Sequence, residues 1–323
     1  MKLSIHPRRW SLKAPFVTAG EVVTHIDVLT VTLSEAGLSG HAETMGVDYL
    51  GETVGSMTAQ LSAFIEGDVS QLIEPSGVVD LPAGGSRNGV DCALWDLRAK
   101  QAGGIAQLTG RKLMPVETLF TVTLDRPEKM AEQALAVPHL KQLKLKLGDE
   151  DTLACLEAVR SARPDARLVI DANGSWNRGL LGALGDALAR LDVALLEQPL
   201  PVAKDHGLER LNYPVPLCAD ESCQGFADLE RIADRYDAIN IKLDKCGGLT
   251  EALKMADWCR RHRKHVMVGN MLGSSLAMAP ALVVAQHADF VDLDGPLWQR
   301  EDVAEPLSIE AGRIFPPSPG LWG

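Results

Sequence analysis

Short apolar segments alternate with amphipathic segments along the chain from about residue 115 onward. Each apolar segment has the length and composition of a buried strand, whereas the amphipathic segments have helical spacing. This alternation is the pattern of βα units built around a parallel sheet. The eight expected strands cover residues 119–124, 143–147, 168–172, 194–197, 217–219, 238–243, 266–268 and 290–293.

The first third of the chain has a different pattern. Residues 28–33 and 38–44 alternate with a period of two, which predicts strands, and residues 88–101 carry apolar side chains at helical spacing. The Gly84-Gly85 turn before this helical segment has neither a GxGxxG pattern nor a P-loop lysine, so we interpret it as a connection. The pattern predicts a small α+β domain ahead of a larger α/β domain.

Polar residues recur at regular intervals at the ends of the expected strands. The intervals between Lys146, Asp171, Glu197, Asp220 and Lys242 are 25, 26, 23 and 22 residues, and Lys242 to Asp292 is 50 residues, or two intervals. One βα unit of a barrel takes about this length, because roughly 200–250 residues are divided among eight units. We therefore expect these side chains at the carboxyl ends of barrel strands, where barrel enzymes keep their chemistry.

Alternation along each strand predicts which way these side chains point. Lys144 and Lys146 share one face of their strand, and the leucines at 143, 145 and 147 share the other. If the aliphatic face packs on helices, the charged groups point into the barrel. The same parity groups Val169 with Asp171 and Asn173, Asn240 with Lys242 and Asp244, and Asp292 with Asp294.

A single Lys or Asp at a strand end is more often a solvated rim residue or a helix cap than a functional group. Six such residues in sequence order at unit spacing are much harder to obtain from rim charges. The repeated spacing therefore favours a functional site over a set of unrelated surface charges.

Asp171, Glu197 and Asp220 are expected to converge from three consecutive strands. Carboxylate oxygens suit Mg²⁺, which takes few protein carboxylates and keeps coordination positions for substrate oxygens. Since no histidine or cysteine joins the set, zinc is disfavoured. The sequence predicts one Mg²⁺ per subunit and does not distinguish it from Mn²⁺.

Lys146 and Lys242, on the second and sixth expected strands, should stand across the barrel mouth from each other. A divalent ion on a substrate carboxylate stabilises the enediolate that forms when the adjacent carbon loses a proton. Burial beside cations is expected to lower the pKa of a lysine toward the operating pH. Two bases on opposite faces of one carbon predict racemisation or epimerisation.

Charge and composition exclude several other classes. A formal net charge of −11 and the lack of a basic run interleaved with aromatics argue against a nucleic-acid partner. The basic run at 260–264 follows an expected helix over 250–259, where cations favour the C-terminal end of the helix dipole. Six scattered cysteines without a CxxC pair predict neither a zinc site nor a disulfide framework.

The location of the protein is also an expectation from sequence. The first 16 residues carry charges where a signal peptide needs an apolar stretch, and no apolar run is long enough to span a membrane. We therefore expect a cytoplasmic protein without a membrane partner. A homo-oligomer is compatible with the sequence, which does not determine the oligomeric state.

Several motifs resemble the muconate lactonizing subgroup of the enolase superfamily, whose sites use a Lys or His base with magnesium. The similarity extends over nearly the whole chain. The matching segments are Asn88–Leu97, Lys144-Leu-Lys146, Asp171-Ala-Asn173, Leu196-Glu-Gln-Pro199, Ala219-Asp-Glu-Ser222 and Asn240–Gly248.

The resemblance implies a modified (β/α)7β TIM-type barrel with an N-terminal α+β capping domain completed by the C-terminal tail. The corresponding limits are 1–113 for the cap, 114–302 for the barrel and 303–323 for the returning segment. It implies that Lys146 and Lys242 are the catalytic acid/base pair and that Lys144 lies beside the substrate carboxylate. The metal ligands would be Asp171, Glu197 and Asp220, with Asn173 and Glu221 behind them.

Asp292-Leu-Asp294 is similar to the Asp-x-Asp of dipeptide epimerases, and Thr121 corresponds to a substrate-contacting threonine of that family. Paired carboxylates opposite the metal would bind the α-ammonium group of a dipeptide by charge-assisted hydrogen bonds. The resemblance is to L-Ala-D/L-Glu epimerases, which recycle murein peptides. It implies inversion of the α-carbon of the C-terminal residue by 1,1-proton transfer.

One departure concerns substrate choice. Members that act on acidic side chains carry arginine in cap loops near residues 20 and 49, but this chain has Ala19-Gly20-Glu21 and Asp48-Tyr49-Leu50. Either another group, such as His25, pairs with an acidic side chain, or the preferred second residue is neutral, apolar or basic.

Other functions fit these residues less well. An o-succinylbenzoate synthase or a muconate cycloisomerase shares the lysines and ligands, but its substrate has no ammonium group for Asp292 and Asp294. A non-catalytic metal-carboxylate binding barrel would be expected to lack a lysine or a ligand, and none is missing. A Ser-His-Asp hydrolase is disfavoured because Gly273-Ser274-Ser275 is no nucleophile elbow.

Overall fold

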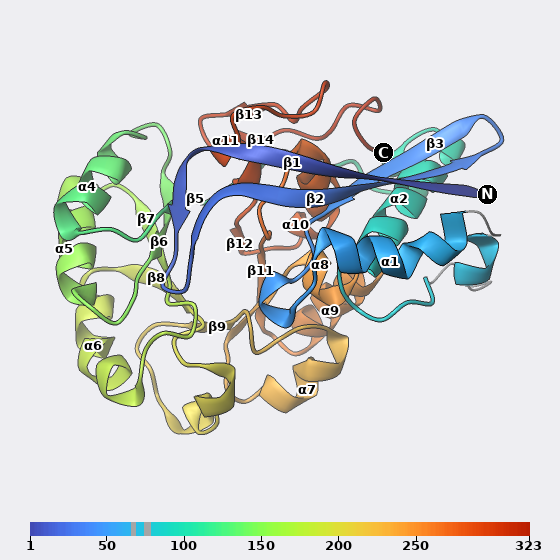
Figure 1. The fold of residues 1–323 in the computed structure, drawn as a ribbon. Coiled ribbons are helices and arrows are strands. Elements are labelled where there is room, and N and C mark those ends of the chain that lie inside the picture. The colour runs from blue at the N-terminus through green and yellow to red at the C-terminus, as the bar shows by residue number, and fades with distance from the viewer. Residues whose placement is uncertain (66–68, 74–78) are drawn as a thin grey trace.

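The computed structural model describes residues 1–65, 69–73 and 79–323, and its centre is an eight-stranded parallel sheet (Figure 1). The strands follow one another in sequence order around the sheet, from β5 to β12. A backbone hydrogen bond of 2.7 Å from Leu119 N to Val291 O links its two edges. The strands are β5 (Phe120–Val122), β6 (Gln142–Lys146), β7 (Arg167–Asp171), β8 (Val193–Glu197), β9 (Leu217–Ala219), β10 (Ala238–Ile241), β11 (His265–Val268) and β12 (Phe290–Val291).

All eight expected strands are present, with differences only at their ends. Strand β10 was expected to continue to residue 243 but ends at Ile241, because the chain turns into a short helix at Leu243. The fold class predicted from the alternation is therefore confirmed.

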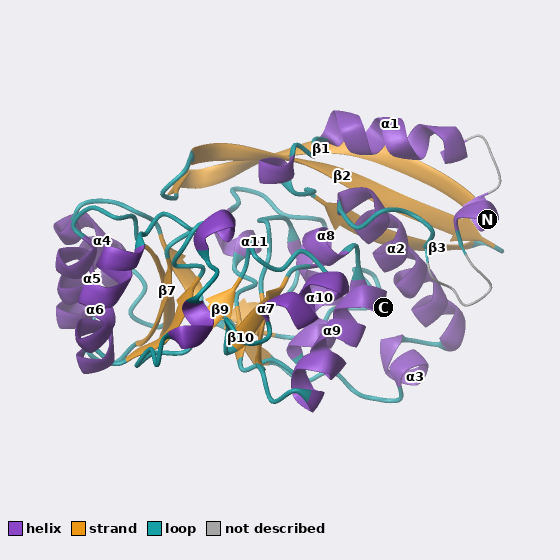
Figure 2. Cartoon of the chain, turned by 90° about the horizontal axis from the view of Figure 1, so that it is seen from below, coloured by secondary structure: helices purple, strands orange, loops and turns teal. Residues whose placement is uncertain are grey.

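Helices follow the strands and cover the outside of the barrel (Figure 2). Asn177 and Ser274 cap two of them, since each side chain accepts a backbone N–H of the first turn. None of the described helices is both long and apolar enough to cross a membrane. The helices are α4 (Pro127–Leu135), α5 (Thr152–Ala162), α6 (Arg178–Arg190), α7 (Leu229–Ile232), α8 (Leu243–Cys246), α9 (Leu249–Arg261), α10 (Ser275–Ala285) and α11 (Gly295–Trp298).

Alternation along the strands divides the apolar side chains into two layers, as predicted. Leu143, Leu145 and Leu147 belong to the large core between the sheet and the helices. The inward side chains form a separate small cluster: Leu119, Val169, Leu195, Cys218, Ala238, Met267 and Phe290. This cluster fills the barrel interior, and the polar strand ends therefore lie on a packed apolar floor.

The cap consists of a three-stranded antiparallel sheet covered by helices. Gly40, on β3, has no side chain because a Cβ there would collide with the backbone of α2 at Ala93 and Leu97. Helix and sheet can therefore approach closely. The elements are β1 (Lys2–Val17), β2 (Val22–Glu35), β3 (Leu38–Thr44), α1 (Val54–Ile65), α2 (Gly85–Ala102) and α3 (Ile105–Thr109).

The turn between β1 and β2 reaches over the barrel (Figures 1 and 2). Phe16, near this turn, packs edge-to-face on Trp298 of α11 with ring centroids 5.0 Å apart. The backbone also connects the two parts, because Arg300 N donates to Ser11 O over 2.9 Å. The cap is thereby fixed to the end of the barrel that carries the polar residues.

The C-terminal segment returns to the cap, as the resemblance implied. On the way, β13 (Ile309–Glu310) and β14 (Arg313–Ile314) form a small sheet with β4 (Val116–Glu117). Trp322 is completely buried and donates from Nε1 to Cys92 O of α2 over 3.1 Å. Gly323 N donates to the Asp96 side chain over 2.6 Å. The domain limits at 113 and 302 stay predictions.

Replacing Trp322 by alanine tests how much this docking stabilises the protein. We expect Trp322→Ala to lower the free energy of unfolding by about 3–5 kcal/mol, because a large buried ring is removed from the cap core. Urea unfolding measures the change, with the exposed Met114→Ala as control. Equal midpoints for the two variants would contradict the docking.

Candidate active site

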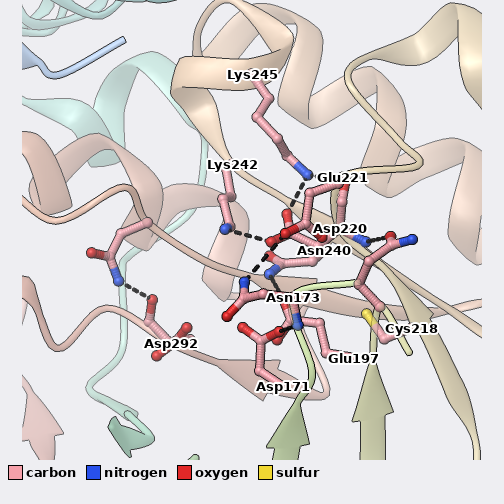
Figure 3. Close-up of polar contacts among 12 residues, drawn as sticks. Asp171, Asn173, Glu197, Cys218, Asp220, Glu221, Asn240, Lys242, Lys245 and Asp292 are labelled. Carbon is pink, nitrogen blue, oxygen red and sulfur yellow. Dashed lines mark hydrogen bonds and ion pairs between the residues drawn. The ribbon is translucent and has the colours of Figure 1, made fainter. Parts of the chain in front are cut away.

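Three buried carboxylates gather at the carboxyl ends of neighbouring strands (Figure 3). Asp171 ends β7, Glu197 ends β8 and Asp220 directly follows β9. The pairing of β7 with β8 places Asp171 beside Glu197. One oxygen from each of the three residues lies within 4.8 Å of the others. The predicted convergence is therefore present.

The donor set fits a hard divalent cation. All three groups offer a carboxylate oxygen and are buried. The thiol of Cys218, on β9, points its hydrogen at the backbone oxygen of Ala219, and burial raises its pKa well above the usual value. Among the described residues, the group that could hold a metal contains no sulfur or imidazole ligand.

Two lysines approach this cluster from opposite sides of the barrel. Lys146, the last residue of β6, lies 2.7 Å from Asp171, whereas Lys242, directly after β10, lies 2.7 Å from Asp220. Three strands separate β6 from β10 in one direction around the sheet, and three separate them in the other. The two lysines therefore belong to opposite sides of the barrel mouth.

Lys144 lies deeper, between the carboxylates. Its Nζ is 3.0 Å from Asp171, 2.8 Å from Glu197 and 2.8 Å from Asp292. Burial lowers the pKa of Lys144, but the attraction of these carboxylates outweighs burial and holds the pKa well above its usual value. Lys144 is thus a fixed cation.

The pKa of Lys242 differs from the sequence expectation. Burial lowers this pKa, as expected, but the ion pair with Asp220 raises it more, and the net shift is upward. Positive charge placed on the carboxylates would weaken this attraction and move the pKa of Lys242 back down.

The pKa values of the three carboxyl groups are shifted in different directions. Burial and the charge of Asp171 raise the pKa of Glu197 to about 8. Burial also raises the pKa of Asp171 and Asp220, but the neighbouring lysines lower both pKa values more strongly, to below the usual range. An added cation would therefore stabilise the ionised form of Glu197 more than that of Asp171 or Asp220.

Asn173 and Glu221 lie behind the cluster as a connected pair. Asn173 donates to Glu221 over 3.2 Å and accepts from Lys146 over 3.1 Å. Burial, together with the charges of Asp220 and Asp171, raises the pKa of Glu221 to about 7. Asn173 has a positive φ of 43°, a conformation that asparagine tolerates better than most residues.

Thr121, Asp292 and Asp294 meet on the side of the barrel next to Lys144. Asp294 accepts from Thr121 N over 2.8 Å and from Trp298 Nε1 over 3.2 Å. Burial and the charge of Asp292 raise the pKa of Asp294 to about 6. Asp292 pairs with Lys144 through one oxygen, while its Oδ1 is buried without a hydrogen-bond donor.

Sequence reasoning missed three residues that orient the cluster. Lys245 donates to Asp220 Oδ1 and to Asp220 O, both over 2.6 Å (Figure 3). Gln198 Oε1 accepts from Asp220 N over 3.0 Å, and Asn240 donates to Glu197 over 2.6 Å. The Lys242-x-x-Lys245 spacing, one helical turn, was the signal for Lys245.

The prediction that Asp244 points into the barrel is wrong. The strand pattern ends before it, and Asp244 lies in α8, where its side chain is directed toward the cap. Its Oδ1 accepts from Thr44 Oγ1 over 2.5 Å and from Gly46 N over 2.9 Å. Asp244 thus fastens the cap segment before residues 48–50 to the barrel.

A cavity of about 930 Å³ lies over the cluster, between barrel and cap. Its floor includes Lys144, Lys146 and Lys242. His25 is not among the described residues that line this cavity. The cap contributes Phe16, Thr18, Gly20, Glu21, Val23, Met45, Asp48, Tyr49 and Leu50.

Comparison with protein families agrees with this architecture. Residues 1–110 match the N-terminal domain of mandelate racemase and muconate lactonizing enzyme, and residues 128–321 match the enolase C-terminal domain-like family. The chain belongs to the enolase superfamily. Among its superfamily relatives, the L-Ala-D/L-Glu epimerase of Escherichia coli (strain K12) is 39% identical over 97% of this chain and 98% of its own length.

Solved structures give the same assignment. An enolase family member from Agrobacterium tumefaciens, solved with sodium and L-Ala-L-Glu, is 41% identical with a TM-score of 0.95 and 99% coverage of both chains. A dipeptide epimerase from Cytophaga hutchinsonii, complexed with Mg and D-Ala-L-Val, is 26% identical with a TM-score of 0.90, covering 98% of this chain and 92% of that one. This superfamily member is an isomerase, and the buried cluster together with the Mg complex confirms the predicted magnesium cofactor.

Magnesium should stabilise this superfamily member through the cluster. At a Mg²⁺ concentration of 100 times Kd, we expect a gain of about 2.7 kcal/mol in the free energy of unfolding. Asp220→Asn should remove most of this gain, because the cluster loses a charged oxygen. Chemical unfolding with and without Mg²⁺ measures the gain, and Asp257→Asn, on the exposed face of α9, is the control. An undiminished gain in Asp220→Asn would place the ion elsewhere.

Proposed function

We propose that this isomerase is a magnesium-dependent dipeptide epimerase, similar to L-Ala-D/L-Glu epimerase, which inverts the α-carbon of the C-terminal residue by two-base proton transfer. The observation that carries the proposal is the position of Lys146 and Lys242 on opposite sides of one carboxylate cluster. The similarity to the L-Ala-D/L-Glu epimerase and to the dipeptide epimerase named above supports it.

Asp171, Glu197 and Asp220 would hold the metal, with Lys245, Gln198 and Asn240 fixing their orientation. When bound, magnesium supplies positive charge that stabilises the negative charge developing on the substrate carboxylate. Lys144 adds a second fixed positive charge at the same point, since it already lies within 3.0 Å of Asp171 and Glu197.

Lys146 and Lys242 would exchange roles between the two directions of the reaction. With the substrate α-carbon between them, the neutral amine of one takes the α-proton while the ammonium of the other delivers a proton to the opposite face. Asn173 holds Lys146 through its side-chain oxygen, and Asp220 holds Lys242. These partners keep both Nζ atoms aimed at the cavity.

Asp292 and Asp294 would bind the α-ammonium group at the other end of the dipeptide. Asp292 keeps a buried oxygen without a donor, which a substrate ammonium group would satisfy. Thr121 lines the same wall and contacts Asp294. The substrate of an o-succinylbenzoate synthase or muconate cycloisomerase has no ammonium group for this carboxylate pair, and a non-catalytic barrel leaves the opposed lysines without a role.

Removing either lysine should abolish epimerisation. We expect Lys146→Ala and Lys242→Ala each to lower kcat by about 10²- to 10⁴-fold, because each variant lacks the acid or base for one face. Circular dichroism or chiral chromatography of a dipeptide measures inversion. The exposed Lys141→Ala, directly before the strand that carries Lys144 and Lys146, is the matched control.

A finer measurement separates two bases from one. In each variant the remaining lysine faces the α-proton of only one epimer. In D₂O the variant should exchange the α-proton of that epimer for deuterium without inverting the α-carbon. If either variant inverts the dipeptide at a rate near that of the parent, the two-base assignment is wrong.

A further inference from the structure

The cap side of the substrate cavity carries negative charge. Glu21 lies at the turn between β1 and β2, and Asp48 lies in a 3-10 helix after β3. Both line the cavity. Burial raises the pKa of Glu21, and the charge of Asp48 adds to this shift. Two acidic groups thus occupy the places where arginines were expected for an acidic substrate.

The two cap loops line the same cavity as Lys146 and Lys242. The charge of Lys146 acts on Glu21, whereas the charge of Lys242 acts on Tyr49, the neighbour of Asp48. The turn that carries Glu21 extends over the barrel strands (Figure 1). A substituent that leaves the space between the lysines toward the cap therefore meets Glu21 and Asp48.

The proposed function determines which substituent this is. The substrate carboxylate is directed to the metal cluster, and the chain toward the N-terminal residue runs to Asp292 and Asp294. The α-proton faces one of the lysines. The remaining substituent of the inverted carbon is its side chain, which has only the cap side of the cavity left.

Cationic side chains are scarce among the described residues that line the cavity. Of the described residues that line the cavity, four are lysine or arginine, and three of these are the lysines of the floor. The fourth, Arg231, donates to Asp228 over 2.6 Å and to Ser222 O over 3.0 Å. The unpartnered Oδ1 of Asp292 adds to the surplus of acceptors in the cavity.

Resting on the proposed function, we infer that the C-terminal residue of the preferred dipeptide is lysine or arginine, with its cationic end between Glu21 and Asp48. Charge-assisted hydrogen bonds to two carboxylates bind such an end well. The aliphatic stem of the side chain would lie along Phe16, Val23 and Leu50, which line the same wall. A glutamate side chain would meet two like charges instead.

A panel of dipeptides tests this preference. L-Ala-L-Lys, L-Ala-L-Arg, L-Ala-L-Gln, L-Ala-L-Met and L-Ala-L-Glu are each incubated with the magnesium-loaded enzyme in D₂O, and deuterium at the α-carbon is followed by mass. We expect kcat/KM for the lysine or arginine dipeptide to exceed that for the glutamine dipeptide by about tenfold or more, with glutamate the poorest. A glutamate or neutral dipeptide that matches or exceeds the basic ones would overturn the preference.

Variants assign the preference to the two carboxylates. Glu21→Gln and Asp48→Asn should each raise KM for the basic dipeptide by about fivefold or more and leave kcat/KM for L-Ala-L-Met nearly unchanged. Glu35→Gln, at the far end of β2 from the turn, is the control. Unchanged selectivity in both cap variants would contradict the role of these residues. Exchange with none of the dipeptides would instead refute the proposed epimerase function itself.

Discussion

Three carboxylates buried within reach of one another repel, and the arrangement of the site follows from how this repulsion is offset. Asp171, Glu197 and Asp220 each present an oxygen within 4.8 Å of the others, and all three are nearly inaccessible to water. Such a cluster is stable only if cations surround it. Lys144 and Lys245 are the fixed cations of this kind, because each is completely enclosed by its acceptors.

Lys146 and Lys242 differ from this fixed pair in their position. Each reaches the cluster through one carboxylate and also borders the cavity. These two lysines balance negative charge on Asp171 and Asp220. A bound divalent cation would neutralise part of that charge instead. The site therefore joins metal binding to base strength, since positive charge on the carboxylates weakens the attraction that raises the pKa of Lys242.

Two further buried carboxylates, Glu43 and Asp244, hold the cap to the barrel. Glu43 of β3 accepts from Trp10 of β1 over 3.0 Å and from Ser274 N of the barrel over 2.7 Å. Asp244 of the barrel accepts from the cap backbone at Met45 and Gly46. The loop that carries Asp48 is thereby tied to the strand end that carries Lys242, so substrate selection and chemistry share one framework.

The barrel and most of the candidate site could be predicted from sequence because both depend on regular spacing. Strand alternation places Lys144, Lys146 and Asp171 inside, and the constant unit length brings Glu197 and Asp220 to the same height. Equivalent strand ends of a parallel barrel must meet, so no knowledge of loops was needed.

Features without a period could not be predicted in this way. Helix α8 has only four residues, too short for a hydrophobic pattern, and its formation turns Asp244 toward the cap and Lys245 toward Asp220. The upward shift of the Lys242 pKa depends on the ion-pair distance to Asp220, which spacing alone does not give. The position of Glu21 in the cavity wall depends on how the cap lies on the barrel.

A crystal structure of the protein with Mg²⁺ and a dipeptide tests the central claim most directly. The account predicts one ion on Asp171, Glu197 and Asp220, with the α-carbon of the C-terminal residue about 3–3.5 Å from Nζ of Lys146 on one face and of Lys242 on the other. An ion bound elsewhere, or two lysines on the same face of that carbon, would contradict it.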